Sequence, residues 1–473
     1  MVAARAAEMA HRAEHHSVPA NAASAKRGDD RRLLEDLYRA AVDAVDPARA
    51  VSRALASDES SARRAPWILA LGKAGAHMCR AAIELFESAG HSAPGALIVT
   101  TTGAEAPTGD VELVYGDHPV PGQGSFAAAE RIASFVERVS RGDDVLVLLS
   151  GGTSSLVAAP VPGISADDVT QLFKCLLASG ADIAASNAIR KRFSRWAAGR
   201  LAVALAKRGA ASVRCLIISD VIGDDLAVIG SGPCVPDPRT AKELLRLVDQ
   251  DEVQSCITPP LKKHLDAVAR GELPETPKPG DPAFRIVTSK IILGNRSARE
   301  GASARAHEIG LAPVNVVDTP IQGDAARTGE RLIRELVQFA ASSAGAHDKR
   351  TARGCMIWGG ETTVRLDANA PPGGRNQELA LAAARALDGL GERARGLALL
   401  AAGSDGRDGP TDAAGAVVDA STWRAIANAS RDPERDLAEH ASHASLESVH
   451  ALLRSRSTGT NVGDIVIGLV KQQ

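Results

Sequence analysis

The feature that most constrains the fold is a buried apolar run that leads into a loop of very small residues. The apolar run Val145–Leu149 is followed by the loop Ser150, Gly151, Gly152, Thr153 and Ser154. Such a short apolar run fits a strand that is covered on both faces of a parallel sheet. Ligands of open parallel sheets bind beyond the carboxyl ends of the strands, and a loop with little side-chain bulk can turn its amides toward an anion. We therefore expect this loop to hold a phosphate or a carboxylate.

Strand, glycine loop and helix alternate along most of the chain, which is typical of α/β folds. The run Trp67–Leu71 ends at Gly72 and leads into a helix at Ala76–Phe86. Further strands are expected at Ala96–Thr101, Val111–Tyr115, Val213–Ser219, Arg285–Leu293, Val314–Val317, Cys355–Trp358, Thr362–Leu366, Leu397–Ala401 and Ile465–Val470. This pattern predicts two α/β domains. The first is Rossmann-like, a mostly parallel sheet flanked by helices, and the second is smaller.

The stretch 271–283 is the expected linker between the domains, because it is rich in proline and glycine. The N-terminal domain then covers 31–270 and the C-terminal domain covers 284–473. Residues 1–30 lack the apolar segment of a secretory signal, and we expect a disordered extension. An organellar targeting segment is the alternative, since basic residues are present there but are mixed with Glu8 and Glu14.

Composition indicates a globular protein with small-molecule partners. The formal net charge is −2 and aromatic residues make up 3% of the chain, so neither a basic surface nor stacking platforms for nucleic acid are expected. No apolar run reaches the roughly 18 residues of a membrane helix, and the cytoplasm is the expected location. The six cysteines include no C-x-x-C pair and are expected to be reduced, mostly buried thiols. The sequence does not fix the number of subunits, and a homodimer is one option.

Two positions in the first half follow expected strands and could contact a phosphate or a metal ion. Lys73 lies between Gly72 and a helix, where an ammonium can reach a phosphate, although an isolated lysine is more often a solvent-facing side chain. Asp220 follows the strand at Val213–Ser219, and a carboxylate there can bind Mg²⁺. Asp225 is a second metal candidate, and the alternative is that the acidic residues near it cap a turn.

Three further groups are candidates for the site. Arg375 is expected in the first turn of a helix, where a positive charge is unfavourable, so it should face an anion unless it is a surface arginine. Asp405 lies in a loop dense in aspartate and glycine, which could hold a metal, accept a hydroxyl proton or form a turn network. Asn187, Arg190 and Lys191 share one face of a helix, which lines a cleft or faces solvent.

The chain lacks one common nucleotide-binding motif and matches another only loosely. No G-x-x-x-x-G-K-[ST] occurs, so ATP binding of the P-loop kind is not expected. The run Gly122–Ala127 matches a relaxed G-x-G-x-x-A, but it follows H-P-V-P instead of a strand, and we interpret it as a chance match.

Taken together, ten ordered segments resemble the class II glycerate kinases, some of which also carry a hydroxypyruvate-reductase label. They are L-A-L-G-K-A-G, G-D-H-P-V-P, L-L-S-G-G-T-S-S-L, S-G-A-D-I-A-A-S-N-A-I-R-K, I-S-D-V-I-G-D-D, G-S-G-P-C-V-P-D-P-R-T, G-G-E-T-T-V, G-G-R-N-Q-E, G-S-D-G-R-D-G-P-T-D-A-A-G and T-G-T-N-V-G-D. The resemblance covers about 31–470 and includes a C-terminal MOFRL region at about 353–470.

The resemblance implies a glycerate 2-kinase that uses ATP and Mg²⁺ to convert D-glycerate into 2-phosphoglycerate, with the active site in the cleft between two α/β domains. The lysine and arginine of the family's active centre would be Lys73 and Arg375, and we add Glu361 and Asn376, from matching motifs, to the expected substrate- or phosphate-binding residues. Thr153 and Ser155 depart from the family loop, which is richer in glycine. A threonine is strained at positive φ, so we expect an ordinary conformation at Thr153.

Two other functions remain open on sequence grounds. An NAD(P)H-dependent hydroxypyruvate reductase would need a dinucleotide site, for which the sequence offers only the weak glycine match. A non-catalytic sensor of small acids would bind the same ligands without turnover. Which carboxylate binds Mg²⁺, and whether Asp220 or Asp405 takes the hydroxyl proton, also remains open.

Overall fold

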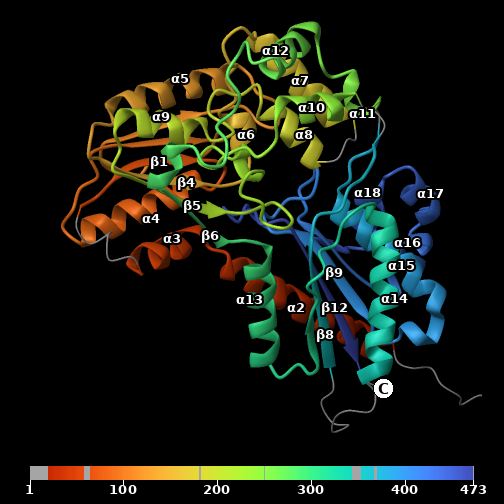
Figure 1. Ribbon diagram of the computed structural model, residues 1–473. Coiled ribbons are helices and arrows are strands. Elements are labelled where there is room, and N and C mark those ends of the chain that lie inside the picture. The colour runs from red at the N-terminus through yellow and green to blue at the C-terminus, as the bar shows by residue number, and fades with distance from the viewer. Residues whose placement is uncertain are drawn as a thin grey trace, which may run out of the picture.

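Two six-stranded sheets, each covered by helices, form the protein (Figure 1). The computed structural model describes residues 20–57, 64–179, 183–249, 251–343, 353–366 and 370–471. None of the helices in these ranges is both long enough and apolar enough to cross a membrane.

The first sheet is entirely parallel, as the sequence predicted, and its strand order is β3-β2-β1-β4-β5-β6. The strands are β1 (Trp67–Leu71), β2 (Ala96–Thr100), β3 (Val111–Tyr115), β4 (Asp144–Leu149), β5 (Ser212–Ile218) and β6 (Val287–Leu293). Helices α5 (Gln123–Arg138) and α9 (Arg200–Arg208) cover one face, and α3 (Pro47–Ala56) and α4 (Gly75–Ser88) cover the other. Each central strand is therefore buried on both sides, which explains its continuous apolar sequence.

A group of helices caps the first sheet beyond its central strands. It comprises α6 (Thr153–Leu156), α7 (Ala166–Ala178), α8 (Ile183–Arg190), the 3₁₀ turn η2 (Ile229–Ser231), α10 (Ala241–Val248), α11 (Asp251–Gln254) and α12 (Pro259–Ala269). Helices α7 and α10 begin with reciprocal capping boxes, Ser165 with Asp168 and Thr240 with Glu243. Their apolar faces form a separate small core.

The second sheet is mixed, with the order β11-β10-β9-β12-β8-β7. Its strands are β7 (Val314–Val316), β8 (Arg353–Gly360), β9 (Ala398–Gly403), β10 (Gly415–Asp419), β11 (Leu452–Leu453) and β12 (Asp464–Lys471). Only β7 and β8 pair in parallel, and β12 runs antiparallel to both of its neighbours. The predicted strand Thr362–Leu366 does not form, because the chain leaves the sheet at Gly360.

Helices α14 (Ala325–Ser343) and α15 (Arg375–Leu390) cover one face of the second sheet, and α2 (Ala20–Ala44) and α13 (Asn295–Glu308) cover the other. The remaining helices are η3 (Pro282–Ile286), η4 (Gly391–Ala394), α16 (Thr422–Asn428), α17 (Pro433–Ala438) and α18 (Ser442–Glu447). Residues of both sheets, among them Ile68 and Ile467, belong to one apolar core together with α2, α3, α4 and α13. This shared core joins the two sheets, and we call it the apolar base.

The structure places three segments differently from the predicted domain ranges. Helix α2 begins at Ala20, within the predicted extension 1–30, and packs on the second sheet although it was assigned to the first domain. Strand β6 lies in the first sheet although its residues follow the predicted linker. The linker itself packs on the first half of the chain, where Thr276 donates a hydrogen bond of 3.0 Å to Asp237. Residues 1–19 lie outside the described ranges.

The expectation of reduced thiols is wrong for two cysteines. Cys175 of α7 and Cys256 form a disulfide, although 81 positions separate them in the sequence. Cys79, Cys215, Cys234 and Cys355 are free and buried, as predicted.

Candidate active site

The candidate site lies where three neighbouring strands of the first sheet end. Strands β1, β4 and β5 are parallel neighbours, so their following loops meet at one edge of the sheet. These loops carry Lys73 after β1, the Ser150–Ser154 loop after β4 and Asp220 after β5. The fold thus brings these predicted site residues to the same edge of the sheet.

The loops after β1 and β4 are bound to each other through Ser150. Its hydroxyl donates to the carbonyl of Leu71 at 3.3 Å and accepts from the amide of Ala74 at 3.1 Å, while the amide of Lys73 donates to the carbonyl of Gly151 at 2.9 Å. A β-carbon at Gly72 would stand 2.4 Å from the carbonyl oxygen of Ser150, so only glycine permits this contact. The Ser150 side chain is buried here and holds Lys73 in place, instead of facing a ligand as predicted.

The two glycines of the loop make room for three ionisable side chains. A β-carbon at Gly151 would stand 2.1 Å from Oδ2 of Asp220. One at Gly152 would stand 3.3 Å from Cγ of Lys73 and 3.2 Å from Cδ2 of His118. The absence of side chains at these positions therefore lets Asp220, Lys73 and His118 gather around the loop.

The positive φ of this loop falls on Gly152, at 86°, and not on Thr153. Thr153 begins α6 in an ordinary conformation, as predicted, and its buried hydroxyl donates to the carbonyl of Ser150 at 2.8 Å. Within the described ranges, the amides of Gly151, Gly152, Thr153 and Ser154 donate to no acceptor. The Ser154 hydroxyl shares a hydrogen bond of 2.6 Å with that of Ser231. The loop thus offers backbone donors, whereas the side chains of Ser150 and Thr153 are used within the fold.

The second sheet contributes a cluster of charged side chains around Arg375. Glu361 follows the last residue of β8, Asp464 begins β12, and Arg375 is the first residue of α15. Arg375 donates from Nη1 to Oε1 of Glu361 at 2.6 Å, from Nε to Oδ2 of Asp464 at 2.7 Å and from Nη2 to Oδ1 of Asp464 at 2.9 Å. The arginine faces negative charge, as its position in the first turn suggested, but this charge belongs to the protein itself.

A second carboxylate of the Asp405 loop, Asp408, caps α15. It accepts from the amides of Asn376 at 3.1 Å and Gln377 at 2.8 Å, which satisfies two donors at the start of the helix. The side chain of Asn376 is buried and donates to Asp408 and Asp464, so it supports the cluster and does not reach a ligand as predicted. Asp405 is half-buried and accepts from the amide of Arg407 at 3.0 Å.

Two adjoining cavities connect these groups, and Glu361 and Thr363 line both. The first cavity, of about 640 Å³, is lined by His118, Gly152, Ser154, Asn187, Arg190, Asp220, Asp225, Gln322, Glu361 and Thr363, together with apolar side chains. The second cavity, of about 500 Å³, is lined by Lys73, Glu361, Thr362, Thr363, Gly373, Gly374, Arg375, Glu378, Asp405, Asp408 and His440, among others. Most of the predicted site residues therefore face one continuous region between the two sheets.

The three predicted ligand-facing residues in and just after α8 lie in two different environments. Asn187 and Arg190 line the first cavity, where the Arg190 guanidinium lies 5.0 Å from the centre of the Phe173 ring. Its Nε is buried and has no hydrogen-bond partner among the described residues. Lys191 instead forms a buried ion pair of 2.8 Å with Asp237 and lines neither cavity.

Burial and charge shift the pKa values of the groups in the cleft. Loss of hydration raises the pKa of Asp220, and the nearby Lys73 charge opposes this shift. Burial also raises the pKa of Glu361 against the effect of Arg375, and the charges of Asp464 and Asp220 add to the rise. The His118 ring remains accessible to solvent within the cleft, yet surrounding protein atoms and then Lys73 lower its pKa to about 4.

The described residues contain no group of three or more histidine, cysteine, aspartate or glutamate side chains that could hold a metal ion by themselves. Magnesium usually takes one or two carboxylates and completes its shell with phosphate and water oxygens. Asp220 and Glu361 fit that requirement, because the charge of one raises the pKa of the other and a cation between them would relieve the repulsion. Asp225 fits less well, since it is exposed and its Oδ1 accepts from the amide of Ala227 at 2.9 Å.

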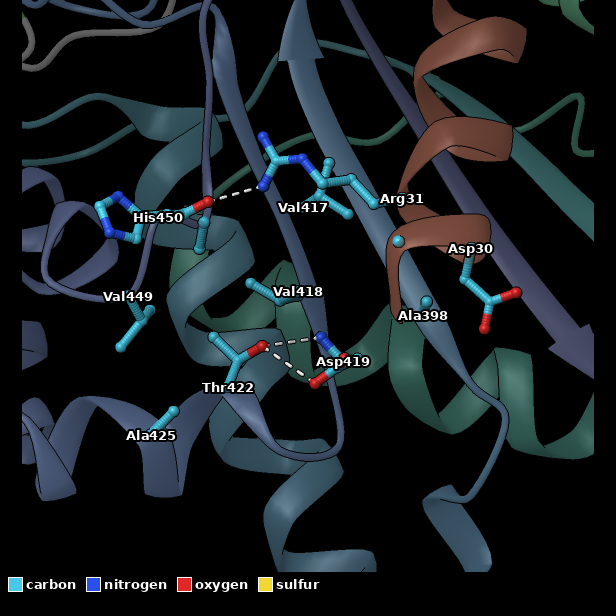
Figure 2. Close-up of a pocket in the computed structure, with 12 residues that line it drawn as sticks. Asp30, Arg31, Ala398, Val417, Val418, Asp419, Thr422, Ala425, Val449 and His450 are labelled. Carbon is cyan, nitrogen blue, oxygen red and sulfur yellow. Dashed lines mark hydrogen bonds between the residues drawn. The ribbon is translucent and has the colours of Figure 1, made fainter. Parts of the chain in front are cut away.

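A separate cavity of about 190 Å³ lies at the other end of β9, next to the start of α2 (Figure 2). Figure 2 shows that its polar groups bond to one another: Arg31 donates to the His450 carbonyl at 2.7 Å, and Thr422 accepts from the Asp419 amide at 2.9 Å. Much of its remaining lining is aliphatic. No predicted site residue lines this cavity, which leaves the two adjoining cavities as the candidate site.

Sequence analysis did not single out Asp464, Asp408 or Gln322. Asp464 ends the motif T-G-T-N-V-G-D, and Asp408 lies in the loop from which only Asp405 was chosen. The available signal for Asp464 was a charged residue directly before a buried strand, which requires a partner. Nothing in the sequence around Gln322 indicated a role.

Comparison with known proteins identifies the family of the chain. A family model described as "Domain of unknown function (DUF4147)" matches residues 33–266, and the MOFRL family matches residues 354–464. A D-glycerate 2-kinase of Thermotoga maritima is 35% identical over 93% of this chain and 98% of its own length. A protein of Agrobacterium vitis that carries the name hydroxypyruvate reductase is 34% identical over 92% of this chain and 93% of its own.

A crystal structure of a glycerate kinase from Thermotoga maritima has the same fold, with a TM-score of 0.78 and 33% identity. The superposition covers 94% of this chain and all of that one, at 100%. The similarity thus extends over nearly the whole chain. The chain therefore belongs to the glycerate 2-kinase family, the class II glycerate kinases that its motifs resemble.

Proposed function

We propose that the protein is a glycerate 2-kinase, which transfers the γ-phosphoryl group of ATP to the 2-hydroxyl of D-glycerate and releases 2-phospho-D-glycerate and ADP. The observation that carries the proposal is the meeting of Lys73 and the free loop amides from the first sheet with Glu361 and Arg375 from the second. Phosphoryl transfer needs positioning and neutralisation of charge more than covalent chemistry. The side chains and amides around the cleft can supply both the positioning and the neutralisation of charge.

The groups that bind anions come from three places. The amides of 151–154 have no acceptor among the described residues and belong to the loop next to Lys73, and we assign these donors to the phosphoryl group that is transferred. Asn187 and Arg190 hold a second anionic or polar group of the substrates in the first cavity. Arg375 has N–H groups left for an oxyanion in the second cavity. These contacts would fix the reacting atoms in line.

Asp220 and Glu361 are the residues that we assign to Mg²⁺, with Asp225 as a weaker candidate. When bound, the ion would neutralise phosphate charge and help to orient the phosphates. The protein's part is to present two carboxylates across the junction of the cavities, one from each sheet. The pKa values of both groups are raised, so their charged forms are disfavoured in the protein alone. A bound cation would favour these charged forms.

The proton of the glycerate hydroxyl has two candidate acceptors. Asp405 lines the second cavity beside Arg375, and its Oδ1 alone is engaged in a backbone hydrogen bond. Asp220 has a raised pKa, which suits a base, but we assign it to the metal. We therefore propose Asp405 as the acceptor. Asp405→Asn should lower kcat and leave the affinity for Mg²⁺ unchanged, whereas Asp220→Asn should weaken Mg²⁺ binding.

The name of the Agrobacterium vitis relative favours a second candidate, reduction of hydroxypyruvate by NADH or NADPH. The glycine match that could serve a dinucleotide lies at the start of α5 (Gln123–Arg138). There the Asp117 carboxylate accepts from the amide of Ser125 at 3.1 Å and occupies the place of a pyrophosphate. This contact disfavours the reductase.

One assay separates the candidates. Purified protein is incubated with ATP, MgCl₂ and D-glycerate, ADP release is coupled to NADH oxidation, and the phosphorylated position is read by NMR. We expect turnover with a 2-phosphorylated product, and a fall of about 10² to 10³ in kcat in Lys73→Ala when a donor to the developing charge is lost. Lys263→Ala, an exposed lysine on α12, is the control. Oxidation of NADH by hydroxypyruvate without ADP release would support the reductase, and ligand binding without either turnover would support a sensor.

We place the reaction in the cytoplasm, where ATP is available. A disulfide such as Cys175–Cys256 is uncommon in that compartment, so the state of this pair in the purified protein is worth measuring.

A further inference from the structure

Asp464 is a fully buried carboxylate at the start of the central strand β12. It pairs with Gly360, the last residue of β8, and with Gly403, the last residue of β9. The Asn295 side chain donates to the backbone carbonyls of Val462 at 3.0 Å and of Asp464 at 2.9 Å, which fixes the chain at this point. Because β12 is antiparallel to its neighbours, Asp464 lies at the edge of the sheet from which the Glu361 and Asp405 loops leave.

A buried carboxylate is costly unless donors satisfy it, and Asp464 has three of them. Nε and Nη2 of Arg375 donate to its two oxygens at 2.7 and 2.9 Å, and Nδ2 of Asn376 donates to Oδ1 at 2.9 Å. The two arginine bonds are parallel, which is the bidentate geometry that fixes the plane of a guanidinium. Asp464 has no exposed surface, so it cannot itself touch a ligand in the cleft.

The way in which Arg375 is held determines which of its donors remain. A guanidinium has five N–H donors. Asp464 takes those of Nε and one on Nη2, and Glu361 takes one on Nη1. One N–H on each Nη is left over, and 34% of the side chain is exposed, at the wall of the second cavity. The protein thus leaves one donor on each Nη available to an oxyanion in the second cavity.

We infer that Asp464 is a positioning residue of the kinase reaction: it fixes the plane of the Arg375 guanidinium so that the two remaining Nη donors point at an oxyanion of the substrate. This inference rests on the proposed function and adds a residue to its site. Asn376 donates to the Asp464 carboxylate and Asn295 donates to the Asp464 backbone carbonyl. Glu361 accepts from Nη1 of the guanidinium.

The protein contains a matched control for the fold. Arg431 and Asp436 form the same bidentate pair, with Nε to Oδ2 at 2.7 Å and Nη2 to Oδ1 at 2.9 Å. Asp436 is also buried, and it accepts a third bond from Ser445. Neither Arg431 nor Asp436 lines the two cavities. Asp436→Asn therefore reports the loss of such a pair without a change in the site.

The test is rescue of Arg375→Ala by free guanidinium ion at millimolar concentration, with sodium chloride of equal ionic strength as the reference. The rate of D-glycerate-dependent ADP release from ATP should fall at least 100-fold in Arg375→Ala and recover at least 10-fold with guanidinium. The recovery should be lost in Arg375→Ala/Asp464→Asn and retained in Arg375→Ala/Asp436→Asn. Equal recovery in both double variants would overturn the inference.

Two further measurements keep the outcome decisive. In Asp464→Asn alone, kcat per folded molecule should fall about 10-fold or more. Asp464→Glu should retain a higher kcat than Asp464→Asn. A kcat of Asp464→Asn equal to that of the wild type overturns the inference, even if guanidinium does not rescue Arg375→Ala. If the wild-type protein does not phosphorylate glycerate, the proposed function has failed separately. A crystal structure of Asp464→Asn then decides the positioning role, since an unmoved Arg375 guanidinium would contradict it.

Discussion

The Asp220 carboxylate lies directly against the backbone of Gly151, so close that a β-carbon on Gly151 would stand 2.1 Å from Oδ2. Two loops from neighbouring strands are thus fitted to each other through the missing side chain of one residue. The contact brings a desolvated carboxylate, the Lys73 side chain and the free amides of the loop into one place.

Substitution of this glycine should damage catalysis more than folding. In Gly151→Ala the added methyl must displace Asp220 or the loop, and a shift of about 1 Å at a reacting centre can cost on the order of 100-fold in rate. We expect that loss in kcat/KM for glycerate. Gly389→Ala on α15 is the control, because nothing lies within 4 Å of a β-carbon there. Full activity in Gly151→Ala would show that Asp220 need not lie where it does.

Asp220 should make the protein less stable at neutral pH. Its folded-state pKa lies above the ordinary value of 3.8, so its charged form is disfavoured by the fold. The destabilisation is absent at pH values below the ordinary value and grows as the pH rises through the folded-state pKa. Asp220→Asn should therefore melt above wild type at pH 7, by an amount of the order of 1 °C, with a smaller difference at pH 4.5.

The control for this measurement is Asp225→Asn, which replaces an exposed carboxylate from the same loop. It should leave the melting temperature unchanged at both pH values. A lower melting temperature for Asp220→Asn at pH 7 would mean that its charge is compensated in the folded protein.

His118 should remain neutral throughout the physiological range. Burial and then the Lys73 charge lower its pKa to about 4, so the folded state favours the neutral ring and loses stability only as the pH falls below the ordinary value of 6.5. NMR spectra of histidine-labelled protein should contain one signal that titrates near pH 4 and disappears in His118→Gln. In Lys73→Met the same signal should titrate at higher pH. A signal near pH 6.5 in wild type would contradict the proposed environment.

Thiol titration tests the cysteine pairing. Unfolded without reductant, the protein should expose four thiols, those of Cys79, Cys215, Cys234 and Cys355, and after reduction all six. Cys256→Ser should expose five thiols without reductant, because Cys175 is then unpaired. Loss of the bond should lower the free energy of unfolding, by at most about 4.5 kcal/mol in the chain-entropy model. Six thiols without reductant would mean that the pair is reduced.

The sequence predicted those parts of the fold that depend on local pattern. β1 has the predicted bounds Trp67–Leu71, because an apolar run covered on both faces has few alternatives. Lys73 and Asp220 could be placed in the site because both follow strands of a parallel sheet. Arg375 could be placed because a cation at a helix start needs a nearby negative charge.

The parts of the fold and of the candidate site that the sequence did not predict depend on contacts between distant segments of the chain. Asp464 is bound by Arg375 across 89 positions of the chain, and no local signal joins them. Lys191 follows Arg190 by one position, so helical geometry turns the two side chains in different directions, but it does not reveal that Asp237 covers one of them. β6 pairs with β5 from beyond a proline-rich stretch, since composition marks a break in secondary structure and not the edge of a sheet.

The apolar base that α2, α3, α4 and α13 form beneath both sheets has a consequence for how the protein can be divided. A fragment that contains the second sheet but not the start of the chain would lack α2, which covers part of one face of the sheet that is formed last in the sequence. The second sheet, which carries Arg375, is therefore complete only when α2 from the start of the chain and β12 from its end are both present.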